Sequence, residues 1–379
     1  MGASETLPAI VVGAGPAGLA TSYELMRRGI EHRVLERGDR AGYTWAHLYD
    51  SLVLHTAKRM SVLPGLRFPK GAPLFPARSD FAAYLERYVT TFRLPVRVGV
   101  NVTRAERQGS DWTIETAAGE VQRTRSLVIA TGIVSNPVVP EFPNRHTFLG
   151  RVDHSACYRR PDAYRGQRVL VVGVGNSGGE IASELARAGV KVTIAVRSGA
   201  IVVPRDILGV PLQYLTPLFG WFPRRAQRAT ANVIGRVAGI FKSKPVLPPP
   251  GPGPCVRVPL IGFHLVNAIR AGTVRLRGGI DEFTRDGVRF LDGSTEVFDA
   301  VILATGYRAA VGMLGSQIGV DDCGFGRRRD RVVSTDQPDL YFVGHNPDIR
   351  GGIYTMGRDA RRAANLILAS QKSKVGSQK

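Results

Sequence analysis

Residues 9–18 read AIVVGAGPAG, and residues 169–179 read VLVVGVGNSGG. In both stretches a four-residue apolar run ends in the pattern G-x-G-x-x-G, and a helical pattern closes eleven residues later, at Gly29 or Gly189. A strand, a glycine turn and a helix in this order are typical of a dinucleotide-binding βαβ unit, because the turn lets a pyrophosphate meet the helix amino terminus. The alternative is that each turn only packs a helix on a strand. Two copies with matched spacing favour an α/β protein with two Rossmann-like domains.

The two copies differ at the end of the strand that follows the helix. The first copy has Glu36 there, within VLERG, whereas the second has Val196, followed by Arg197 and Ser198, within IAVRS. A carboxylate at this place accepts hydrogen bonds from the ribose hydroxyls and repels a 2′-phosphate. Arginine can instead bind that phosphate with two parallel hydrogen bonds. The first copy therefore predicts FAD or NAD(H), and the second predicts NADP(H).

Length and composition indicate a globular protein of two domains. The 379 residues include 44% hydrophobic and 22% charged residues, and the net charge is +20. Such a charge raises the possibility of a nucleic-acid partner. However, the arginines occur as scattered doublets without interleaved aromatic residues, and no helix-turn-helix or zinc module is present. We therefore expect no nucleic-acid binding, and assign the charge to surface composition and to anionic substrates and cofactors.

The cysteines and the apolar segments indicate the cellular compartment that we expect for the protein. Cys157, Cys255 and Cys323 lie far apart without a C-x-x-C pair, which excludes a dithiol redox centre, predicts no metal site and fits a reducing cytoplasm. The amino terminus lacks the features of a secretory signal. The sequence contains no run of 18 apolar residues, so we expect no transmembrane helix. The apolar segment 207–222 contains two prolines and is interpreted as a buried cap or tunnel wall. A peripheral membrane contact is the less favoured interpretation.

Apolar periodicity gives an outline of the remaining chain. It predicts a helix over 78–92, short strands over 96–100, 111–117 and 119–123, strands over 126–132 and 299–307, and a helix over 354–369 with a frayed tail from Ser370. The last two strands end in Ala130-Thr131-Gly132 and Ala304-Thr305-Gly306, and the second glycine pattern lies between them. One domain is therefore expected to be inserted into the other. The small residues at these crossings allow close approach to a cofactor, although tight strand-end turns would also explain them.

A third motif, Phe148-Leu-Gly-Arg-Val-Asp-His154-Ser-Ala-Cys-Tyr158, matches the fingerprint F-x-G-x-x-x-H-x-x-x-Y. With both glycine patterns and both Ala-Thr-Gly turns in order, the chain resembles the class B flavin-containing monooxygenases from about residue 8 to 368. Residues 49–58, YDSLVLHTAK, resemble the YUCCA branch, the indole-3-pyruvate monooxygenases, whereas Baeyer-Villiger relatives usually carry Trp in place of Tyr158. Two places depart from that branch, namely Gly179 and the segment 344–365.

The resemblance implies a glutathione-reductase-like fold in which an NADPH domain is inserted into an FAD domain. We expect residues 1–155 to form the first part of the FAD domain and residues 299–379 its second part, with the carboxy-terminal helix. Residues 156–298 would form the NADPH domain, with the apolar cap or substrate segment at about 204–255.

The resemblance also implies that NADPH reduces FAD and that O₂ then adds to give a C4a-(hydro)peroxyflavin, which survives only in a dry site. The favoured reaction is oxidative decarboxylation of an aryl 2-oxo acid such as indole-3-pyruvate. The alternatives are N- or S-oxygenation of an amine or sulfide, and an NADPH-dependent flavin reductase that passes electrons to a partner. The expected partners are a small-molecule substrate and O₂, and a homodimer is left open.

Candidate site residues follow from the motifs and the resemblance. His55 and Thr56 are catalytic candidates near the flavin and nicotinamide. His154 and Tyr158 are counted with them as linker or gating elements, and proton transfer by His154 is the less favoured alternative. The candidates for holding FAD and NADPH comprise the two glycine turns, the strand ends and both Ala-Thr-Gly turns: Gly13, Gly15, Pro16, Ala17, Gly18, Glu36, Arg37, Thr44, Trp45, Thr131, Gly132, Gly173, Gly175, Asn176, Ser177, Gly178, Arg197, Ser198, Thr305 and Gly306.

Overall fold

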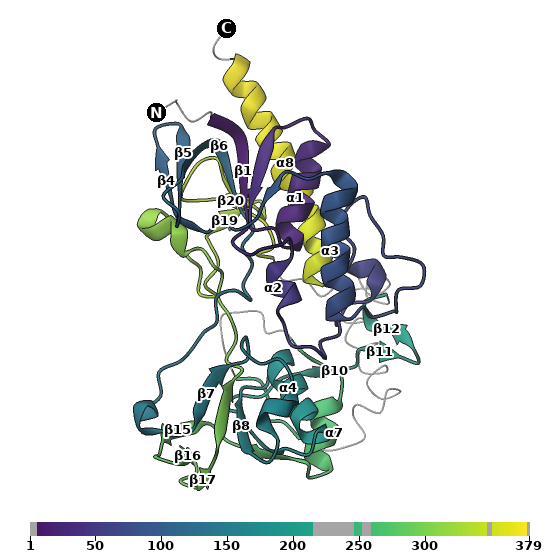
Figure 1. Cartoon of the computed structure of the whole chain (residues 1–379), viewed down its shortest axis with the longest axis vertical. Helices are drawn as coiled ribbons and strands as arrows, with labels where there is room; N and C mark the ends of the chain where they lie inside the picture. The colour runs from purple at the N-terminus through teal and green to yellow at the C-terminus, as the bar shows by residue number, and fades with distance from the viewer. Residues whose placement is uncertain (1–5, 215–245, 252–258, 347–350, 377–379) are drawn as a thin grey trace, which may run out of the picture. The chain divides into compact units, whose positions relative to one another are not determined.

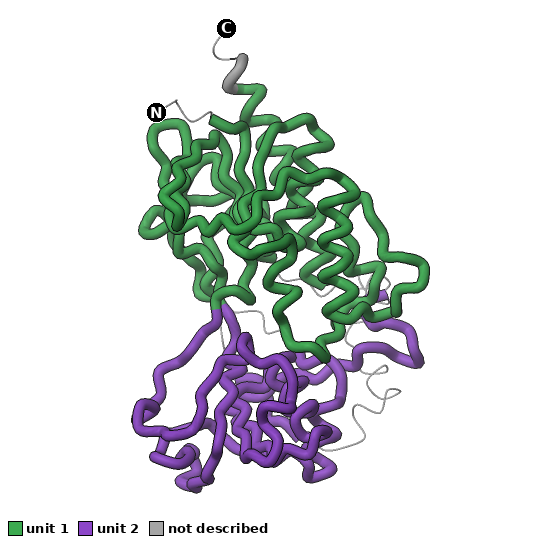
Figure 2. Tube along the Cα trace, viewed as in Figure 1, with its two compact units in different colours: residues 1–136, 308–379 green, residues 137–307 purple. Residues whose placement is uncertain are grey.

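The computed structural model describes residues 6–214, 246–251, 259–346 and 351–376. The chain divides into two compact units, coloured separately in Figure 2. Unit 1 consists of residues 1–136 and 308–379, and unit 2 consists of residues 137–307. These divisions differ from the sequence-based ones at 155/156 and 298/299. The reason is that β7 (Arg151–His154) and β18 (Ala300–Leu303) pair in parallel within the sheet of unit 2.

The described part of unit 1 contains a nine-stranded sheet in which β1 pairs in parallel with both β2 and β6 (Figure 1). The parallel strand β21 lies on the other side of β6, so four neighbouring strands end at the same edge. The strands of this sheet are β1 (Thr6–Val12), β2 (His32–Leu35), β3 (Val96–Arg97), β4 (Val102–Gln108), β5 (Asp111–Thr116), β6 (Val121–Ile129), β19 (Arg328–Arg329), β20 (Val333–Ser334) and β21 (Leu340–Phe342).

Three helices of unit 1, α1 (Pro16–Met26), α3 (Arg78–Phe92) and α8 (Gly352–Gly376), pack together beside this sheet (Figure 1). The helix predicted over 78–92 is confirmed as α3, because its apolar residues recur at helical spacing and are buried. Asp80 accepts a hydrogen bond from the backbone N–H of Ala77 and so caps its amino terminus. One apolar core lies between these helices and the sheet, and a second lies on the opposite face around Trp112 and Phe342.

Two predicted boundaries in unit 1 are wrong. The strands expected over 119–123 and 126–132 form one continuous strand, β6, whose first half alternates exposed and buried residues and whose second half is wholly buried. The tail from Ser370 is helical rather than frayed, since α8 extends to Gly376. The Ser370 hydroxyl donates a hydrogen bond to Asp339, which ties this end of the helix to the strand region of unit 1.

Unit 2 is built around a five-stranded parallel sheet in the order β14-β9-β8-β18-β7. Helices α4 (Asn176–Arg187) and α7 (His264–Arg270) pack on it, and a separate three-stranded antiparallel sheet adjoins its core. The remaining strands of these two sheets are β8 (Arg168–Val172), β9 (Lys191–Ala195), β14 (Val274–Arg277), β15 (Ile280–Phe283), β16 (Gly287–Phe290) and β17 (Thr295–Val297).

The apolar segment 207–222 is described only as far as residue 214; the remainder lies outside the described residues. Its beginning forms a small hairpin of β11 (Asp206–Ile207) and β12 (Val210–Pro211). Leu208 at the tip is 95% exposed, so the tip does not belong to a buried wall. Within the described ranges, no helix has the length and apolar character needed to cross a membrane.

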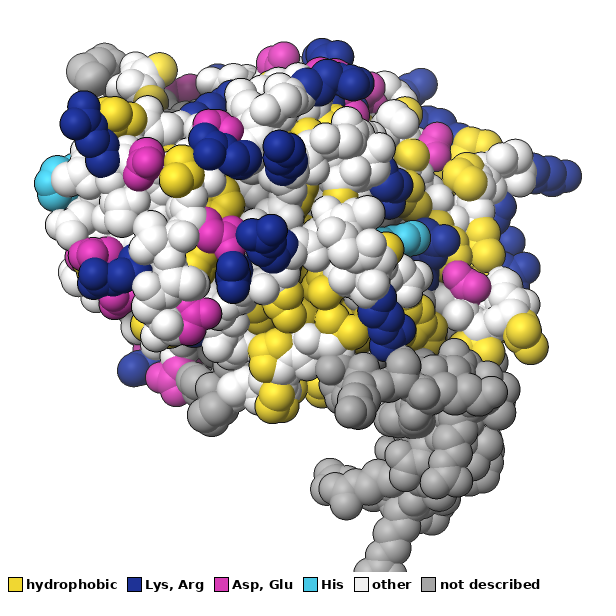
Figure 3. Space-filling model, turned by 90° about the horizontal axis from the view of Figure 1, so that it is seen from below, with side chains coloured by type: hydrophobic (Ala, Val, Ile, Leu, Met, Phe, Trp, Pro, Cys, Tyr) yellow, Lys and Arg dark blue, Asp and Glu magenta, His cyan; other side chains and the backbone are white. Residues whose placement is uncertain are grey.

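The charged side chains are dispersed over the face shown in Figure 3. Lys and Arg side chains lie scattered there, several of them beside Asp or Glu, rather than in one continuous band.

Candidate functional site

The first glycine turn connects β1 to α1 at the edge of the sheet where the parallel strands end. Gly13 has φ +102°, and a Cβ atom on it would meet the carbonyl oxygen of Ala130 at 2.7 Å, so the turn requires glycine. A Cβ atom on Gly18 would overlap the carbonyl of Gly13, whereas one on Gly15 would meet no protein atom within 4 Å. No side chain caps the amino terminus of α1. The middle glycine therefore leaves an open cradle against a helix amino terminus, which fits a pyrophosphate.

Glu36 lies directly after β2, and its carboxylate is held at this turn. One carboxylate oxygen accepts a hydrogen bond from the N–H of Ala14 at 2.7 Å, and the other accepts one from the N–H of Gly38 at 2.9 Å. The side chain is buried. A buried carboxylate beside the glycine turn is well placed for ribose hydroxyls and would repel an extra phosphate. Arg37, which follows it, is exposed.

The second glycine turn repeats this construction between β8 and α4. Gly173 has φ +108°, and a Cβ atom on it would meet the carbonyl oxygen of Ala304 at 2.5 Å. A Cβ atom on Gly178 would overlap the carbonyl of Gly173, and again the middle glycine, Gly175, faces open space. Unit 2 therefore carries a second cradle of the same shape at the amino terminus of α4.

The end of β9 differs from the end of β2 as the sequence predicts. Val196 is buried and continues the pairing of β9, since its N–H donates a hydrogen bond to the carbonyl of Arg277. Arg197 is exposed beside Gly279, and its guanidinium has no partner among the described residues. The neighbouring Arg277 is already paired with Glu296. Arg197 is therefore the available cation at this strand end, as a 2′-phosphate requires.

Asn176, at the start of α4, uses its side chain to hold another part of unit 2. Its amide group donates a hydrogen bond to the carbonyl of Pro259 at 3.1 Å and accepts one from the N–H of Ile261 at 2.8 Å. A Cβ atom on Gly179 would meet a Leu260 methyl group at 2.8 Å. Gly179, where the chain departs from the YUCCA pattern, therefore lies beside the Leu260 side chain in the segment that Asn176 holds.

The two Ala-Thr-Gly turns have equivalent hydrogen bonds, one in each unit. The Thr131 hydroxyl donates to the carbonyl of Ala310 at 2.7 Å, and the Thr305 hydroxyl donates to the carbonyl of Val138 at 2.5 Å. Ala130 and Ala304 each lie against the first glycine of their own unit's turn. Each threonine hydroxyl therefore fastens the strand end beside a glycine turn to the segment where the chain passes from one unit to the other. Gly132 and Gly306, which follow the threonines, have positive φ values.

The fingerprint residues His154 and Tyr158 are buried in unit 2. The His154 ring donates from Nε2 to the carbonyl of Gly306 at 3.1 Å and accepts at Nδ1 from the N–H of Ala156 at 3.1 Å. Burial lowers the pKa of His154, so this neutral form persists. The Tyr158 hydroxyl donates to Glu184 on α4 at 2.9 Å, and burial raises its pKa. His154 therefore holds the second Ala-Thr-Gly turn, and Tyr158 holds α4.

The other candidates lie in the region of unit 1 between β2 and α3. The Thr56 hydroxyl is 2.6 Å from the Ser61 hydroxyl, and the Thr56 side chain lies against the Cα of Gly351, at the start of α8. His55 is half-buried. Thr44 and Trp45 belong to the short helix α2 (Tyr43–Ala46), and the Trp45 ring packs edge-on against Phe81 with 4.6 Å between centroids.

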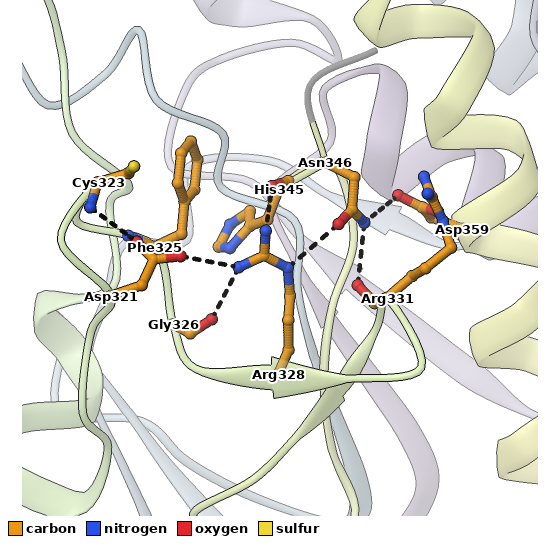
Figure 4. A network of polar contacts seen from close by, with 9 residues as sticks. All are labelled: Asp321, Cys323, Phe325, Gly326, Arg328, Arg331, His345, Asn346 and Asp359. Carbon is orange, nitrogen blue, oxygen red and sulfur yellow. Dashed lines mark hydrogen bonds and ion pairs between the residues drawn. The ribbon is translucent and has the colours of Figure 1, made fainter. Parts of the chain in front are cut away.

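Figure 4 shows a polar network at the carboxyl end of β21 that the motifs did not predict. Arg328 donates hydrogen bonds to the carbonyl of His345 at 2.6 Å and to the side-chain oxygen of Asn346 at 3.3 Å. Asn346 in turn donates to Asp359, a wholly buried carboxylate on α8, at 2.6 Å. Arg331 completes the ion pair with Asp359 at 2.8 Å. The network ties the end of β21 to α8.

His345 itself is wholly buried, and its ring lies 5.3 Å, between centroids, from the rings of both Phe325 and Phe342. Neither ring nitrogen has a hydrogen-bond partner among the described residues. One signal in the sequence could have revealed this network: Asp359 occupies a buried position in the helical pattern of α8, and a buried carboxylate requires a cationic partner.

Comparison with known proteins places this geometry in a family. The profile of the family described as pyridine nucleotide-disulphide oxidoreductase matches residues 10–206. Among solved structures, a flavin-containing monooxygenase from Stenotrophomonas maltophilia superposes with a TM-score of 0.78, at 24% identity over 97% of this chain and 99% of that one. Cyclohexanone monooxygenase from Rhodococcus bound to NADP⁺ gives a TM-score of 0.72, at 19% identity over 98% and 85% of the chains. The predicted two-domain Rossmann-type fold is confirmed.

In sequence, the chain is similar to plant indole-3-pyruvate monooxygenases. The rice (Oryza sativa subsp. japonica) indole-3-pyruvate monooxygenase YUCCA1 is 38% identical over 80% of this chain and 77% of its own length. The probable indole-3-pyruvate monooxygenase YUCCA1 of Arabidopsis thaliana is 35% identical over 80% of this chain and 76% of its own. The chain therefore belongs to the flavin-dependent monooxygenases of the YUCCA family, oxidoreductases that work with FAD and NADPH.

Proposed function

We propose that this monooxygenase oxidatively decarboxylates an aryl 2-oxo acid, with indole-3-pyruvate as the type substrate. In that reaction the 2-oxo acid, O₂, NADPH and a proton yield CO₂, the carboxylic acid one carbon shorter, NADP⁺ and water. The observation that carries the proposal is the 38% identity, over 80% of the chain, to a relative that bears this activity in its name. The resemblance of residues 49–58 to the same branch supports it.

We assign FAD to unit 1 and NADPH to unit 2. The cradle at Gly15 would hold the FAD pyrophosphate on backbone N–H groups at the amino terminus of α1, and Glu36 would accept hydrogen bonds from the ribose. The cradle at Gly175 would hold the NADPH pyrophosphate, with Arg197 on the 2′-phosphate. When bound, FAD supplies the electron transfer between NADPH and O₂.

The remaining site residues position groups rather than exchange protons. Both ring nitrogens of His154 are engaged with backbone groups, so its role is to hold the Gly306 crossing in place. The Tyr158 hydroxyl is engaged with Glu184 and fixes the fingerprint segment on α4. His55 and Thr56 are assigned to the reaction site. The Ser61 hydroxyl donates to a backbone carbonyl, so the Thr56 hydroxyl donates to Ser61, and its oxygen can accept a hydrogen bond from a bound group.

We infer a small-molecule enzyme of the cytoplasm that does not bind nucleic acid. The dispersed cations on the face shown in Figure 3 support the second part for that face, because nucleic-acid binding requires a continuous basic surface. A homodimer stays an open prediction.

A product assay tests the proposed reaction. The enzyme is supplied with FAD, NADPH and O₂, and with indole-3-pyruvate, phenylpyruvate, trimethylamine or a thioether. We expect CO₂ and the shortened acid from the two 2-oxo acids, with one NADPH consumed for each CO₂. An N-oxide or sulfoxide without CO₂ release would replace the proposal with oxygenation of a soft nucleophile.

A further inference from the structure

Unit 1 contains a hollow that no cofactor assignment uses. It has a volume of about 720 Å³ and lies between the loop 59–67 and one face of α8. We name it the arginine hollow after its polar lining, which consists of Arg59, Arg67, Tyr354, Arg358, Arg361, Arg362 and Asn365.

The charge of the arginine hollow is poorly compensated by the protein. Among the described residues that line it, none is acidic. Arg361 lies 3.3 Å from Glu24, which is already paired with Arg28 at 2.6 Å, and Arg362 lies 3.6 Å from Asp330. The guanidinium groups of Arg59, Arg67 and Arg358 make no hydrogen bond or ion pair with any described residue.

This arrangement costs stability, since Arg358, Arg361 and Arg362 stand three and four residues apart on α8. Like charges at these spacings repel one another on a helix face. An anion in the hollow would relieve this repulsion. Guanidinium groups bind carboxylates with two parallel hydrogen bonds and also stack on aromatic rings.

The loop side of the hollow is apolar between Arg59 and Arg67. It is formed by the loop residues Val62, Leu63, Pro64 and Leu66. A Cβ atom on Gly357 would meet Pro64 at 3.1 Å, so the loop packs closely on α8 at this point. A lining that combines apolar side chains with guanidinium groups fits an aryl or alkyl acid better than a bare inorganic anion.

The hollow begins close to the residues assigned to the reaction site. Arg59 follows Thr56 by three residues, and Tyr354 lies about one helical turn beyond Gly351. Gly351 is the residue whose Cα lies against the Thr56 side chain. An acid held in the hollow is therefore next to the segment that carries Thr56.

We propose that the arginine hollow captures the anionic aryl acid before it reaches the reaction site. This inference rests on the proposed function, because it takes the aryl 2-oxo acid as the substrate. Fixed positive charge raises the local concentration of an anionic substrate and its association rate, and salt weakens the effect.

The test compares two double variants of the FAD-loaded enzyme. Arg59→Gln with Arg358→Gln removes two unpaired cations from the hollow. Arg123→Gln with Arg125→Gln removes two exposed cations from β6, outside it, and is the matched control. We expect the hollow variant to raise KM for phenylpyruvate roughly tenfold with kcat unchanged. The control should keep the wild-type KM, and added salt should raise KM only where the hollow is intact.

A binding measurement separates this inference from the proposed function. Calorimetry uses phenylacetate, an unreactive carboxylate, and its neutral counterpart 2-phenylethanol. The hollow variant should bind phenylacetate roughly tenfold more weakly than the control, and 2-phenylethanol should not distinguish the variants. If both binding results are observed but phenylpyruvate yields no CO₂, the proposed reaction is wrong and the arginine hollow remains a binding site for aryl acids.

Three results would overturn the hollow as a capture site while leaving the proposed reaction intact. The first is equal phenylacetate binding and equal KM in both double variants. The second is loss of 2-phenylethanol binding together with that of phenylacetate. The third is a response confined to inorganic phosphate or to vesicles of anionic phospholipid, which would assign the cations to another anion.

Discussion

Arg197 and Glu36 are the residues on which the proposed assignment of one nucleotide to each unit rests. Glu36 is buried and bonded to the glycine turn, so an additional phosphate beside it would meet an uncompensated negative charge. Arg197 is exposed, whereas the neighbouring Arg277 is already paired with Glu296. The proposed cofactor preference therefore rests on residues outside both glycine patterns.

Arg197→Ala should lower the affinity for NADPH and leave that for NADH nearly unchanged. Loss of a charge-assisted hydrogen bond to the 2′-phosphate costs about 1.5 to 3 kcal/mol of binding free energy. The measurement is the concentration of each nucleotide that gives half the maximal rate of anaerobic flavin reduction. Lys191→Ala, at the opposite end of β9, is the control. Equal losses with both nucleotides would contradict the assigned contact.

His345 predicts how stability depends on pH. Burial, with a contribution from the Arg328 guanidinium, lowers the pKa of His345 to about 3 from an ordinary value of 6.5. Below pH 6.5 His345 is therefore protonated in the unfolded chain, whereas in the folded chain it stays neutral down to about pH 3. The free energy of unfolding should fall as the pH falls through this window, by about 2 kcal/mol for this residue between pH 7 and pH 5.

His345→Leu should remove this part of the pH dependence. Urea unfolding at pH 7 and pH 5 measures it: the variant should lose about 2 kcal/mol less than the wild type over that interval. The buried His32, whose pKa is also lowered by burial, remains in both proteins. The exposed His47→Leu is the control. An unchanged pH dependence in His345→Leu would refute the buried neutral state.

At the scale of elements, the two glycine turns offer a matched test. A Cβ atom on Gly15 or Gly175 meets no protein atom, so Gly15→Ala and Gly175→Ala should fold normally. The added methyl group would stand where a pyrophosphate approaches the helix, so each variant should weaken its own cofactor at least roughly tenfold. Gly15→Ala should purify with little FAD, and Gly175→Ala should keep FAD but require more NADPH.

Circular dichroism and the flavin content of the purified proteins check this prediction. Gly71→Ala, on an exposed turn with open space around its Cα, is the control. If Gly15→Ala loses affinity for NADPH and retains FAD, the assignment of FAD to unit 1 and NADPH to unit 2 must be reversed. Normal binding of both cofactors in both variants would mean that the turns only pack a helix on a strand.

Sequence patterns predicted the elements whose periodicity is local. Helix α3 has its predicted bounds because four buried side chains recur at helical spacing. Both glycine turns were predicted because they combine a steric requirement with a fixed spacing. The β4 strand and the full extent of α8 were missed, since polar residues on their exposed positions obscure the pattern.

The polar network around Asn346 shows the limit of such prediction. Its members Arg328, Asn346 and Asp359 come from a hairpin, a loop and a helix, and only tertiary packing brings them together. The same holds for the arginine hollow, whose lining comes from residues about 300 positions apart in the chain. Positions of this kind depend on long-range contacts that a linear motif does not encode.

At the scale of the whole molecule, the chain forms two units with the same nucleotide-binding construction. Each has a parallel sheet, a glycine turn before a helix, and an Ala-Thr-Gly turn whose threonine hydroxyl holds the crossing chain. The chain passes between the units at residues 136/137 and 307/308, next to those turns. Two such sites in one chain allow electrons from NADPH to reach FAD and then O₂, and the rest of the site must exclude water.

Rapid mixing tests this central claim most directly. The FAD-loaded enzyme is reduced anaerobically with one equivalent of NADPH and then mixed with O₂ in a stopped-flow spectrometer. The account predicts a transient absorbance band that belongs to neither reduced nor oxidised flavin, followed by oxygenated product when phenylpyruvate is present. Immediate return of the oxidised spectrum, with one H₂O₂ formed for each NADPH and no product, would contradict it.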